Sequence, residues 1–369
     1  MAPPHHLLTE VAAGRGISGA AVDHAVVDSA IEHRMSSLLL QAIRESGSAA
    51  AHDVRARLEA LDIAAELQRH RLMSVAAAVH RRLDETGIDH LFFKGAVEAY
   101  RIFDDPNHRP FADLDICLAP GASLSEATAA IQPGYPDVEH LDGLVAGGYL
   151  SSVAFFEAGQ AIDLHTDMVR VGSGARHPGL WWENTVFVDL PGLGPVRALS
   201  REASFVVFLL HQARDRFRYL IGAAEFQRRL SAGLSFEIVR SLATAEGVWD
   251  QVAVAMAAMS DDLGIPQPVN VPGGLRSRVW RRLWSADIRL SGPEGRLRHT
   301  RRGRWMMPVL ARGRTGATLR WIARSAFPPA AHLRRRHPDA RGPYIWRAVS
   351  ARVGHSVRRR IQAASNRRG

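Results

Sequence analysis

A short apolar segment that carries two acidic residues, DLDICLA at 113–119, constrains the fold more than any other feature. In a β-strand the side chains at i and i+2 point to the same face, about 6.5–7 Å apart, so Asp113 and Asp115 would share one face. Leu114 and Ile116 would then point to the other face. Two carboxylates side by side on an apolar strand repel one another and resist burial unless cations bind between them. The segment therefore predicts a strand that presents a cation site.

A third carboxylate, Asp163, lies in a similar apolar segment, AIDLH at 161–165. If this strand pairs beside 113–119, the three carboxylates could hold two Mg²⁺ ions, since Mg²⁺ prefers carboxylate and phosphate oxygens. Two metal ions about 3.5–4 Å apart serve in-line displacement at phosphorus. His165 shares a strand face with Asp163. It either contacts the nucleotide or acceptor, or it is a structural histidine.

The pattern along the chain predicts three regions before the C-terminal segment. Residues 1–86 are expected to be helical, because 20–46 and 52–86 have apolar residues at helical spacing and few helix breakers. Residues 87–199 are expected to form a catalytic core, and residues 200–264 a helical region that packs on it. The elements expected in the core are a strand at 88–94, a short helix after Gly95, a strand at 113–119, a helix at 123–132, and hairpins at 149–166 and 185–199.

The C-terminal part of the chain differs sharply in charge from the rest. Residues 271–369 contain 25 Arg and 3 acidic residues, a local balance of +22, so the first 270 residues carry −12. The Pro- and Gly-containing stretch 265–274 is the predicted linker, and 275–369 is the Arg-rich segment that follows it. Such a segment is expected to contact a polyanion: nucleic acid, a membrane surface, or the protein's own acidic body. Composition does not choose among these three.

Cysteine content and hydropathy restrict the location. Cys117 is the single cysteine, which excludes an intramolecular disulfide and a zinc site built from several thiolates. A reducing, cytoplasmic environment fits this composition. The sequence contains no run of about eighteen apolar residues and no signal peptide pattern, so no membrane span is expected.

Lys94 is the single lysine among 47 basic residues. A compact ammonium suits a point contact to one phosphate better than the planar guanidinium of arginine does. The alternative is that one lysine codon has survived by chance in an Arg-rich background. The position of Lys94, immediately before Gly95 at the end of an apolar strand, favours the functional interpretation.

The whole run 91–118, LFFKGAVEAYRIFDDPNHRPFADLDICL, resembles the signature of the uncharacterised nucleotidyltransferase family, part of the DNA polymerase beta-like nucleotidyltransferase superfamily. Six residues of this run fall on the signature: Lys94, Gly95, Arg109, Pro110, Asp113 and Asp115. The segment AIDLH resembles a later strand of the family and places Asp163 and His165. A helical segment with L-x-x-H places His211, and 327–341 resembles the family's C-terminal segment. The resemblance thus spans about 60–345.

The sequence departs from the wider superfamily at the start of the site. Gly95-Ala96 stands where the superfamily usually has Gly-Gly or Gly-Ser, so no hydroxyl is available there. We expect Lys94 and the amides at the start of the following helix to hold the donor phosphates instead, because a helix N-terminus binds anions. The interval from Gly95 to Asp113 is also long. Glu225 stands where the family commonly has Asp.

The resemblance implies an α+β fold, a small mixed twisted sheet of nucleotidyltransferase type with helical N- and C-terminal additions. It implies that an acceptor hydroxyl or amine attacks the α-phosphate of an NTP, such as ATP, and that pyrophosphate leaves. Two Mg²⁺ ions, or Mn²⁺, would be held by Asp113, Asp115 and Asp163. The implied nucleotide-binding residues are Lys94, Gly95, Arg109 and His165. For Arg109 the alternative is an ion pair with Asp104 or Asp105, and for His211 a structural hydrogen bond is favoured.

Two other classes of function compete with this one. The first is a catalytically silent nucleotidyltransferase fold that serves as a binding module. The three carboxylates argue against it, because a silent copy has no electrostatic reason to keep them together. The second is a nucleic-acid-binding protein that acts through the Arg-rich segment. The sequence does not specify the acceptor, the preferred base or the oligomeric state.

Overall fold

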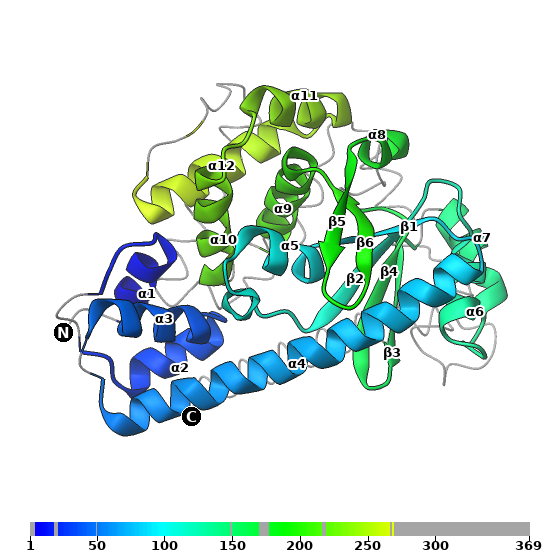
Figure 1. Cartoon of the computed structure of the whole chain (residues 1–369). Helices are drawn as coiled ribbons and strands as arrows, with labels where there is room; N and C mark the ends of the chain where they lie inside the picture. The colour runs from blue at the N-terminus through cyan, green and yellow to red at the C-terminus, as the bar shows by residue number, and fades with distance from the viewer. Residues whose placement is uncertain are drawn as a thin grey trace, which may run out of the picture.

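The computed structural model describes residues 4–265, apart from 18–20, 49, 148–149, 170–176 and 216–218, together with Pro268. Within these residues the chain forms a mixed α/β fold in which helices cover a single six-stranded sheet (Figure 1). The sheet with flanking helices agrees with the predicted fold class. The Arg-rich segment 275–369 and all of the predicted linker except Ile265 and Pro268 lie outside the described residues.

The sheet is mixed, as expected, with the strand order β3-β4-β2-β1-β6-β5. Its central pair consists of β1 (His90–Phe93) and β2 (Asp113–Leu118), which run antiparallel. β2 pairs in parallel with β4 (Gln160–His165), and β1 pairs in parallel with β6 (Gly194–Leu199). The two edge strands, β3 (Ser152–Glu157) and β5 (Thr185–Leu190), complete the predicted hairpins with β4 and β6.

The N-terminal region is helical, as predicted, but it divides differently from the pattern at 20–46. The elements are α1 (Pro4–Ala12), α2 (His24–Glu32), α3 (Ser36–Ser46) and α4 (His52–Glu85). The chain breaks between α2 and α3, where Arg34 has φ 59°. The carbonyl of His33 there accepts a hydrogen bond from the backbone N–H of Ile221, at 3.3 Å. The left-handed Arg34 ends α2 without a Gly or Pro to mark the break in the sequence, and the same segment contacts a segment almost 190 residues away.

The long helix α4 connects the N-terminal helices to the sheet (Figure 1). Its 34 residues run from beside α2 and α3 to beside α6. The half from Leu72 to Leu83 buries an apolar stripe against the sheet, where it contacts β2 and β4. The helix ends at Thr86, and Gly87 follows with φ +68°. A left-handed residue of this kind commonly terminates a helix, and the end agrees with the sequence prediction.

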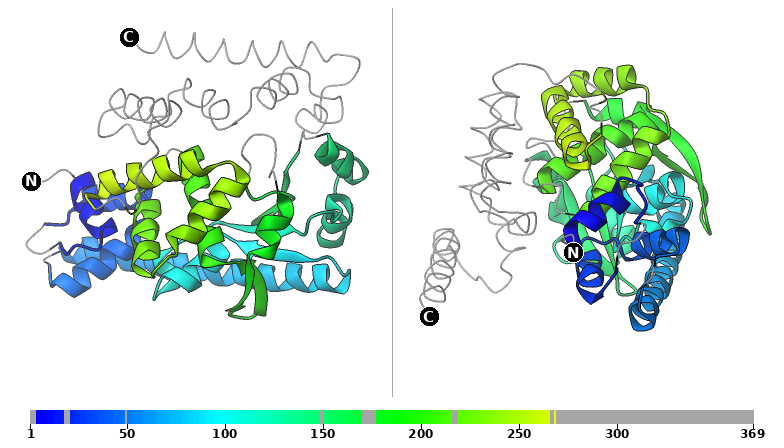
Figure 2. Two further views of the ribbon diagram at one scale, coloured as in Figure 1. Left: turned by 90° about the horizontal axis from the view of Figure 1, so that it is seen from above. Right: turned by 90° about the vertical axis from the view of Figure 1, so that its left-hand side faces the viewer.

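The remaining described helices comprise one that follows β1 and one that follows β2, four shorter ones, and a final group of four. α5 (Gly95–Ile102) follows β1, and α6 (Leu124–Ile131) begins at Ser123, whose hydroxyl accepts a hydrogen bond from the Glu126 N–H at 3.0 Å. Shorter helices are η1 (Pro106–His108), η2 (Val138–His140), α7 (Leu141–Ala146) and α8 (Pro178–Glu183). The last group is α9 (Arg201–Asp215), α10 (Leu220–Ser231), α11 (Phe236–Glu246) and α12 (Trp249–Leu263). Figure 2 shows the sheet between α4 on one side and these four helices on the other.

The strands divide the core between the two faces of the sheet. On β2, Leu114 and Ile116 join the apolar cluster formed with the second half of α4, whereas Cys117 joins the cluster formed with α9–α12. Because side chains alternate along a strand, Asp113 and Asp115 lie on the same face as Cys117. The carboxylates therefore point toward the side of the sheet that α9–α12 cover. Among the described residues, no helix combines the length and apolar character needed to span a bilayer.

Candidate active site

Parallel pairing of β2 and β4 brings the predicted carboxylates together. Asp115 stands directly opposite Asp163 in the register, and Asp113 stands opposite Ala161. Cross-strand partners point to the same face of a sheet, so Asp115 and Asp163 are neighbours there. Asp115 is buried, with 4% of its side chain exposed, whereas Asp163 keeps 25% exposed. Asp113 is exposed at the beginning of β2.

His165 bridges the two paired carboxylates. Its Nε2 lies 2.9 Å from Asp115 Oδ1 and 3.2 Å from Asp163 Oδ2. Carboxylate oxygens accept hydrogen bonds, so Nε2 carries the proton and donates it. The ring is fully buried and packs edge-on against Phe93, with the ring centroids 5.0 Å apart. His165 therefore fixes the position of Asp115 and lies beside Asp163.

Lys94 brings an ammonium group to the same carboxylates. It connects β1 to α5 with φ 57°, and its ammonium contacts Asp115 Oδ1 and lies 4.9 Å from the centroid of the Phe93 ring. About a quarter of the side chain is exposed. A positive φ is uncommon for a residue with a side chain and marks a position where the local structure imposes the conformation. The strand end thus turns the single lysine toward the carboxylates.

Gly95 is required by packing. A Cβ atom built on Gly95 would lie 2.4 Å from Cβ and 2.9 Å from Cγ of Phe111. Phe111 stands two residues before Asp113, in the loop that leads into β2. The close approach of this loop to the start of α5 is therefore possible only because residue 95 has no side chain. Gly95 sets the place of the backbone between Lys94 and the carboxylates.

The pKa values of the two aspartates of β2 shift in opposite directions. Burial alone would raise the pKa of Asp115, but the Lys94 ammonium and the hydrogen bond from His165 outweigh it, and the pKa lies below its usual value. Loss of hydration among the surrounding atoms raises the pKa of Asp113, and repulsion from Asp115 adds to this shift. Asp115 is thus held as a carboxylate, whereas Asp113 carries charge that its surroundings do not fully neutralise.

The donor set fits a divalent cation. Asp115, Asp163 and His165 each offer one possible ligand atom, and these atoms lie within 4.8 Å of one another. His165 Nε2 donates to Asp115 and lies beside Asp163, so the carboxylates supply the oxygens that Mg²⁺ and Mn²⁺ prefer as ligands. Asp113 is not part of this group, since its carboxylate lies nearer the exposed end of β2.

Arg109 has a different partner from the two that were expected. Its Nε donates to Glu225 Oε2 on α10 at 2.6 Å, rather than to Asp104 or Asp105. Glu225 Oε1 in turn accepts from Arg229 Nη2 at 2.7 Å, and Arg229 Nη2 also lies 3.1 Å from Glu98 on α5. We call these four residues the Glu225 network. It links the loop before β2 to α5 and α10.

The sequence analysis singled out Arg109 and Glu225 separately, but it did not predict that they belong to the Glu225 network. Its members come from three segments spread over more than 120 residues, and no spacing rule connects them. The signal that was present is the apolar character of α10 around Glu225 and Arg229, because charged residues within such a face are rarely buried unless they are paired. His211 makes the expected structural hydrogen bond: its Nε2 lies 3.0 Å from the carbonyl oxygen of Met168.

Comparison with known families now decides where the chain belongs. Residues 21–258 match the family described as uncharacterised nucleotidyltransferase, which is more than half of the chain. The chain belongs to this family. The match includes Lys94, Gly95, Arg109 and the carboxylates of β2 and β4, and it ends before the predicted C-terminal resemblance at 327–341.

Two further comparisons add little. A search of curated proteins finds no match. A solved structure described as an antigenic nucleotidyltransferase-like protein from Paracoccidioides brasiliensis is similar at 15% sequence identity and a TM-score of 0.33, and the match covers 52% of this chain and 92% of that chain. A similarity this weak has no bearing on the activity of this family member.

Proposed function

We propose that this family member transfers a nucleoside monophosphate from an NTP to a hydroxyl or amine of a small-molecule, peptide or protein acceptor. The observation that carries the proposal is the in-register pair Asp115 and Asp163, which His165 orients and Lys94 partly neutralises. An acidic pair on one sheet face, with Asp115 buried and Asp163 partly exposed, beside the Lys94 ammonium suits a metal-bound triphosphate.

Asp115 and Asp163 would hold Mg²⁺, or Mn²⁺, with Asp113 completing the set at the exposed end of β2. When bound, these ions would polarise the α-phosphate and lower the pKa of the acceptor hydroxyl or amine. Asp163, which is the more exposed of the paired carboxylates, is placed to take the acceptor proton. The acceptor oxygen or nitrogen forms a bond to the α-phosphorus, the bond from phosphorus to the bridging oxygen breaks, and pyrophosphate leaves with the electron pair.

Lys94 and the start of α5 would hold the donor phosphates. The ammonium now contacts Asp115, and an incoming phosphate oxygen would compete with that carboxylate for it. The backbone N–H groups at the beginning of α5 would add an anion-binding helix end close to Lys94.

Arg109 is assigned two roles in the proposal. Through Glu225 it holds the loop that leads into Asp113, and the face of its guanidinium not used by Glu225 is available to a phosphate. The first role is positional and the second is a direct contact to nucleotide. His165 has a positioning role toward Asp115 and Asp163, with contact to the nucleotide as its further predicted role.

The remaining predictions about partners and location stand as part of this proposal. The Arg-rich segment 275–369 would bind a polyanion, and its deletion should lower affinity for nucleic acid or anionic vesicles without changing metal-dependent NTP binding. A cytoplasmic location is proposed because the single cysteine, Cys117, is a buried free thiol.

The test is label transfer from NTPs that carry a radioactive α-phosphate, with Mg²⁺ or Mn²⁺ and a panel of hydroxyl and amine acceptors. Wild-type protein should label an acceptor or itself, and Asp115→Asn should lose at least about a hundredfold in rate, since its carboxylate is proposed to bind metal directly. Asp250→Asn, on α12, serves as the matched control and should behave as wild type.

Calorimetry with Mg²⁺ and NTP separates this proposal from its rivals. Loss of binding in Asp115→Asn, together with label transfer by the wild type, supports an enzyme. Tight NTP binding without any transfer would instead support a silent binding module. Label transfer that Asp115→Asn retains in full would overturn the site.

A further inference from the structure

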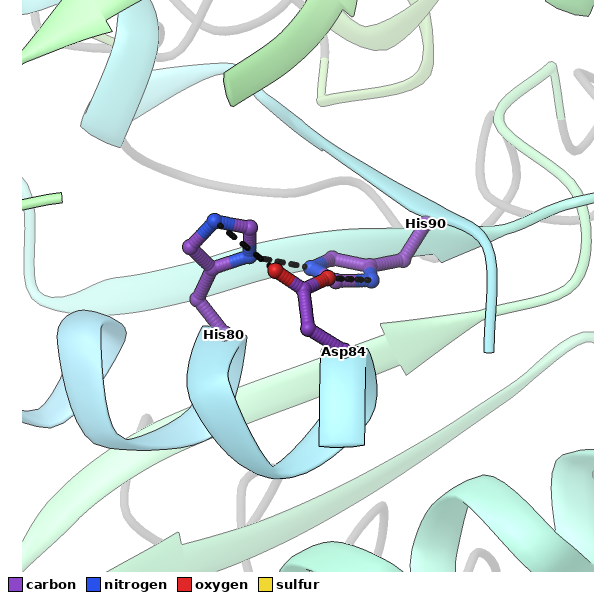
Figure 3. A group of neighbouring side chains, drawn as sticks. All are labelled: His80, Asp84 and His90. Atoms are coloured by element: carbon purple, nitrogen blue, oxygen red, sulfur yellow. Dashed lines mark hydrogen bonds and ion pairs between the residues drawn. The ribbon is translucent and has the colours of Figure 1, made fainter. Parts of the chain in front are cut away.

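A second group of metal-binding side chains lies at the junction of α4 and β1, away from the carboxylates of β2 and β4. His80 and Asp84 project from α4, and His90 is the first residue of β1 (Figure 3). Each offers one ligand atom, and these atoms lie within 4.8 Å of one another. We propose that these three residues bind a transition-metal dication of the zinc class, which ties the end of α4 to the start of β1. This inference does not depend on the proposed function.

His90 has the arrangement of a metal-binding imidazole. Its Nδ1 lies 2.8 Å from the carbonyl oxygen of Ile88. A carbonyl only accepts, so Nδ1 carries the proton and the lone pair lies on Nε2. Histidines that bind metals usually donate their second ring nitrogen to such a carbonyl, which fixes the ring and its tautomer.

His80 completes a nitrogen pair with His90. His80 Nδ1 lies 2.8 Å from His90 Nε2, and the two rings meet edge to face. Figure 3 shows the two rings turned toward one another, with the Asp84 carboxylate beside them. Two imidazole nitrogens select zinc and its neighbours over Mg²⁺ and Ca²⁺, which prefer oxygen ligands.

Asp84 supplies a carboxylate from the same face of α4, one turn after His80. Its Oδ2 lies 3.5 Å from His80 Nε2 and its Oδ1 lies 3.9 Å from His90 Nδ1, the nitrogens that the two rings do not turn toward each other, so the carboxylate lies alongside the imidazole pair. The Asp84 side chain is 59% exposed, so the outer side of the group is open to water, which would serve as the fourth ligand.

The bland alternative is a hydrogen bond between the two rings, in which His80 Nδ1 donates to His90 Nε2. Ligands on tetrahedral zinc, with Zn–N bonds of about 2.0–2.1 Å, stand about 3.4 Å apart. The rings must therefore separate by roughly half an ångström to admit the ion. His80 is partly exposed on a helix surface, whereas His90 is buried, so His80 is the residue that can move.

The experiment uses untagged full-length protein that has been stripped of metal with a chelator. Zn²⁺ affinity is measured by competition with a chromophoric chelator, and bound Co²⁺ is followed by its visible absorption. Wild type should bind one tight equivalent. His80→Asn should weaken binding about a hundredfold, and Asp84→Asn about tenfold, because each removes one ligand. His70→Asn, which changes an exposed histidine on the same helix, is the matched control and should not change affinity.

Two further measurements separate this group from the carboxylates of the candidate active site. Asp163→Asn should keep the tight Zn²⁺ equivalent, since it alters only the other group. A saturating excess of Zn²⁺ should raise the thermal midpoint of wild type by roughly 5 °C or more, and that of Asp84→Asn by much less. Because Asp84 is exposed, its variant tests the site even if His80→Asn disturbs folding.

Wild-type Zn²⁺ affinity in both His80→Asn and Asp84→Asn would overturn the proposal. So would a tight equivalent that disappears in Asp163→Asn alone, because the ion would then belong to the other group. Absence of tight binding in the wild type would leave the two histidines as a hydrogen-bonded pair only.

Discussion

Asp115 and Glu225 are both buried carboxylates that carry charge, yet their surroundings differ in kind. Glu225 lies between the guanidinium groups of Arg109 and Arg229, and Arg229 also pairs with Glu98. Both oxygens of Glu225 are therefore occupied by guanidinium donors. Asp115 lies between an ammonium and a histidine, and its neighbour Asp163 is partly exposed. The closed arrangement holds elements together, whereas the open one retains oxygens that a ligand can reach.

The pKa values of Glu225 and Asp115 are both lowered, but by different kinds of group. Burial would raise the pKa of Glu225, but Arg109 and Arg229 outweigh it, and the pKa lies below its usual value. The pKa of Asp115 is lowered in the same sense by Lys94 and His165. Both pKa values are thus lowered, by two guanidinium groups at Glu225 and by an ammonium and a hydrogen-bonding imidazole at Asp115. The difference predicts which substitutions reduce stability and which reduce ligand binding.

The largest effect is expected from Glu225→Gln. This change leaves Arg109 and Arg229 facing a neutral amide in a buried place, which should cost about 3–5 kcal/mol of unfolding free energy. Urea unfolding followed by circular dichroism measures it. Glu237→Gln, an exposed glutamate on α11, is the control and should stay within about 0.5 kcal/mol of wild type. Equal stability of the two variants would show that the Glu225 network is not structural.

A smaller effect, confined to binding, is expected at Lys94. A positioned charge-assisted contact is worth roughly 1.5–3 kcal/mol, so Lys94→Ala should weaken NTP binding by about tenfold or more. Lys94→Arg should restore only part of it, because a planar fork replaces a compact ammonium. Both residues have a Cβ, so the positive φ is equally strained in all three proteins.

The measurement at Lys94 compares NTP with nucleoside monophosphate affinity by calorimetry. Loss limited to the triphosphate places the ammonium on the β- or γ-phosphate. Equal weakening of both ligands, or wild-type affinity in Lys94→Arg, would mean that other groups hold the donor phosphates.

The smallest effect is a pH-dependent gain in stability from Asp113→Asn. Because the pKa of Asp113 is raised in the folded state, the folded protein binds its proton more tightly than the unfolded chain does. Stability of wild type therefore falls as pH rises from the unfolded value, about 3.9, through the raised folded value. Asp113→Asn removes that loss, so its thermal midpoint should exceed that of wild type at neutral pH and equal it near pH 3.

Thermal scans of wild type and Asp113→Asn from pH 3 to pH 8 give the result. Asp115→Asn should behave in the opposite way, since a lowered pKa contributes stability above the unfolded value that is lost as pH falls. If the thermal midpoints of wild type and Asp113→Asn are equal from pH 3 to pH 8, the repulsion between Asp113 and Asp115 is relieved in solution.

Local patterns in the sequence predicted most of what positions the candidate site. Apolar runs identified β1, β2 and β4, with Gly or Pro after the first two and Gly159 before the third, and the alternation along β2 placed Asp113 and Asp115 on one face. The pairing of Asp115 with Asp163 was conditional on the order of strands, because residues 119–159 separate the two and strand order is a property of the whole sheet.

Contacts between distant segments could not be predicted. Arg109 was expected to contact phosphate, with Asp104 or Asp105 as the alternative partner, yet it pairs with Glu225, 116 residues away on α10. The backbone contact between His33 and Ile221, at the break after α2, also joins segments far apart in the sequence. The approach of His80 to His90 likewise depends on the turn at Thr86 and Gly87, which reverses the chain so that a helix face meets a strand end.

The parallel register of β2 and β4 has a consequence for how the protein tolerates change. A slip of one residue would bring Ile162 or Leu164 opposite Asp115 and would send Asp163 into the apolar layer beneath the sheet. Errors of pairing would therefore damage chemistry and folding together. Insertions in the long crossover that joins these strands are tolerated only if they leave this alignment untouched, so the placement of the proposed metal ligands and the burial of the apolar layer depend on one register.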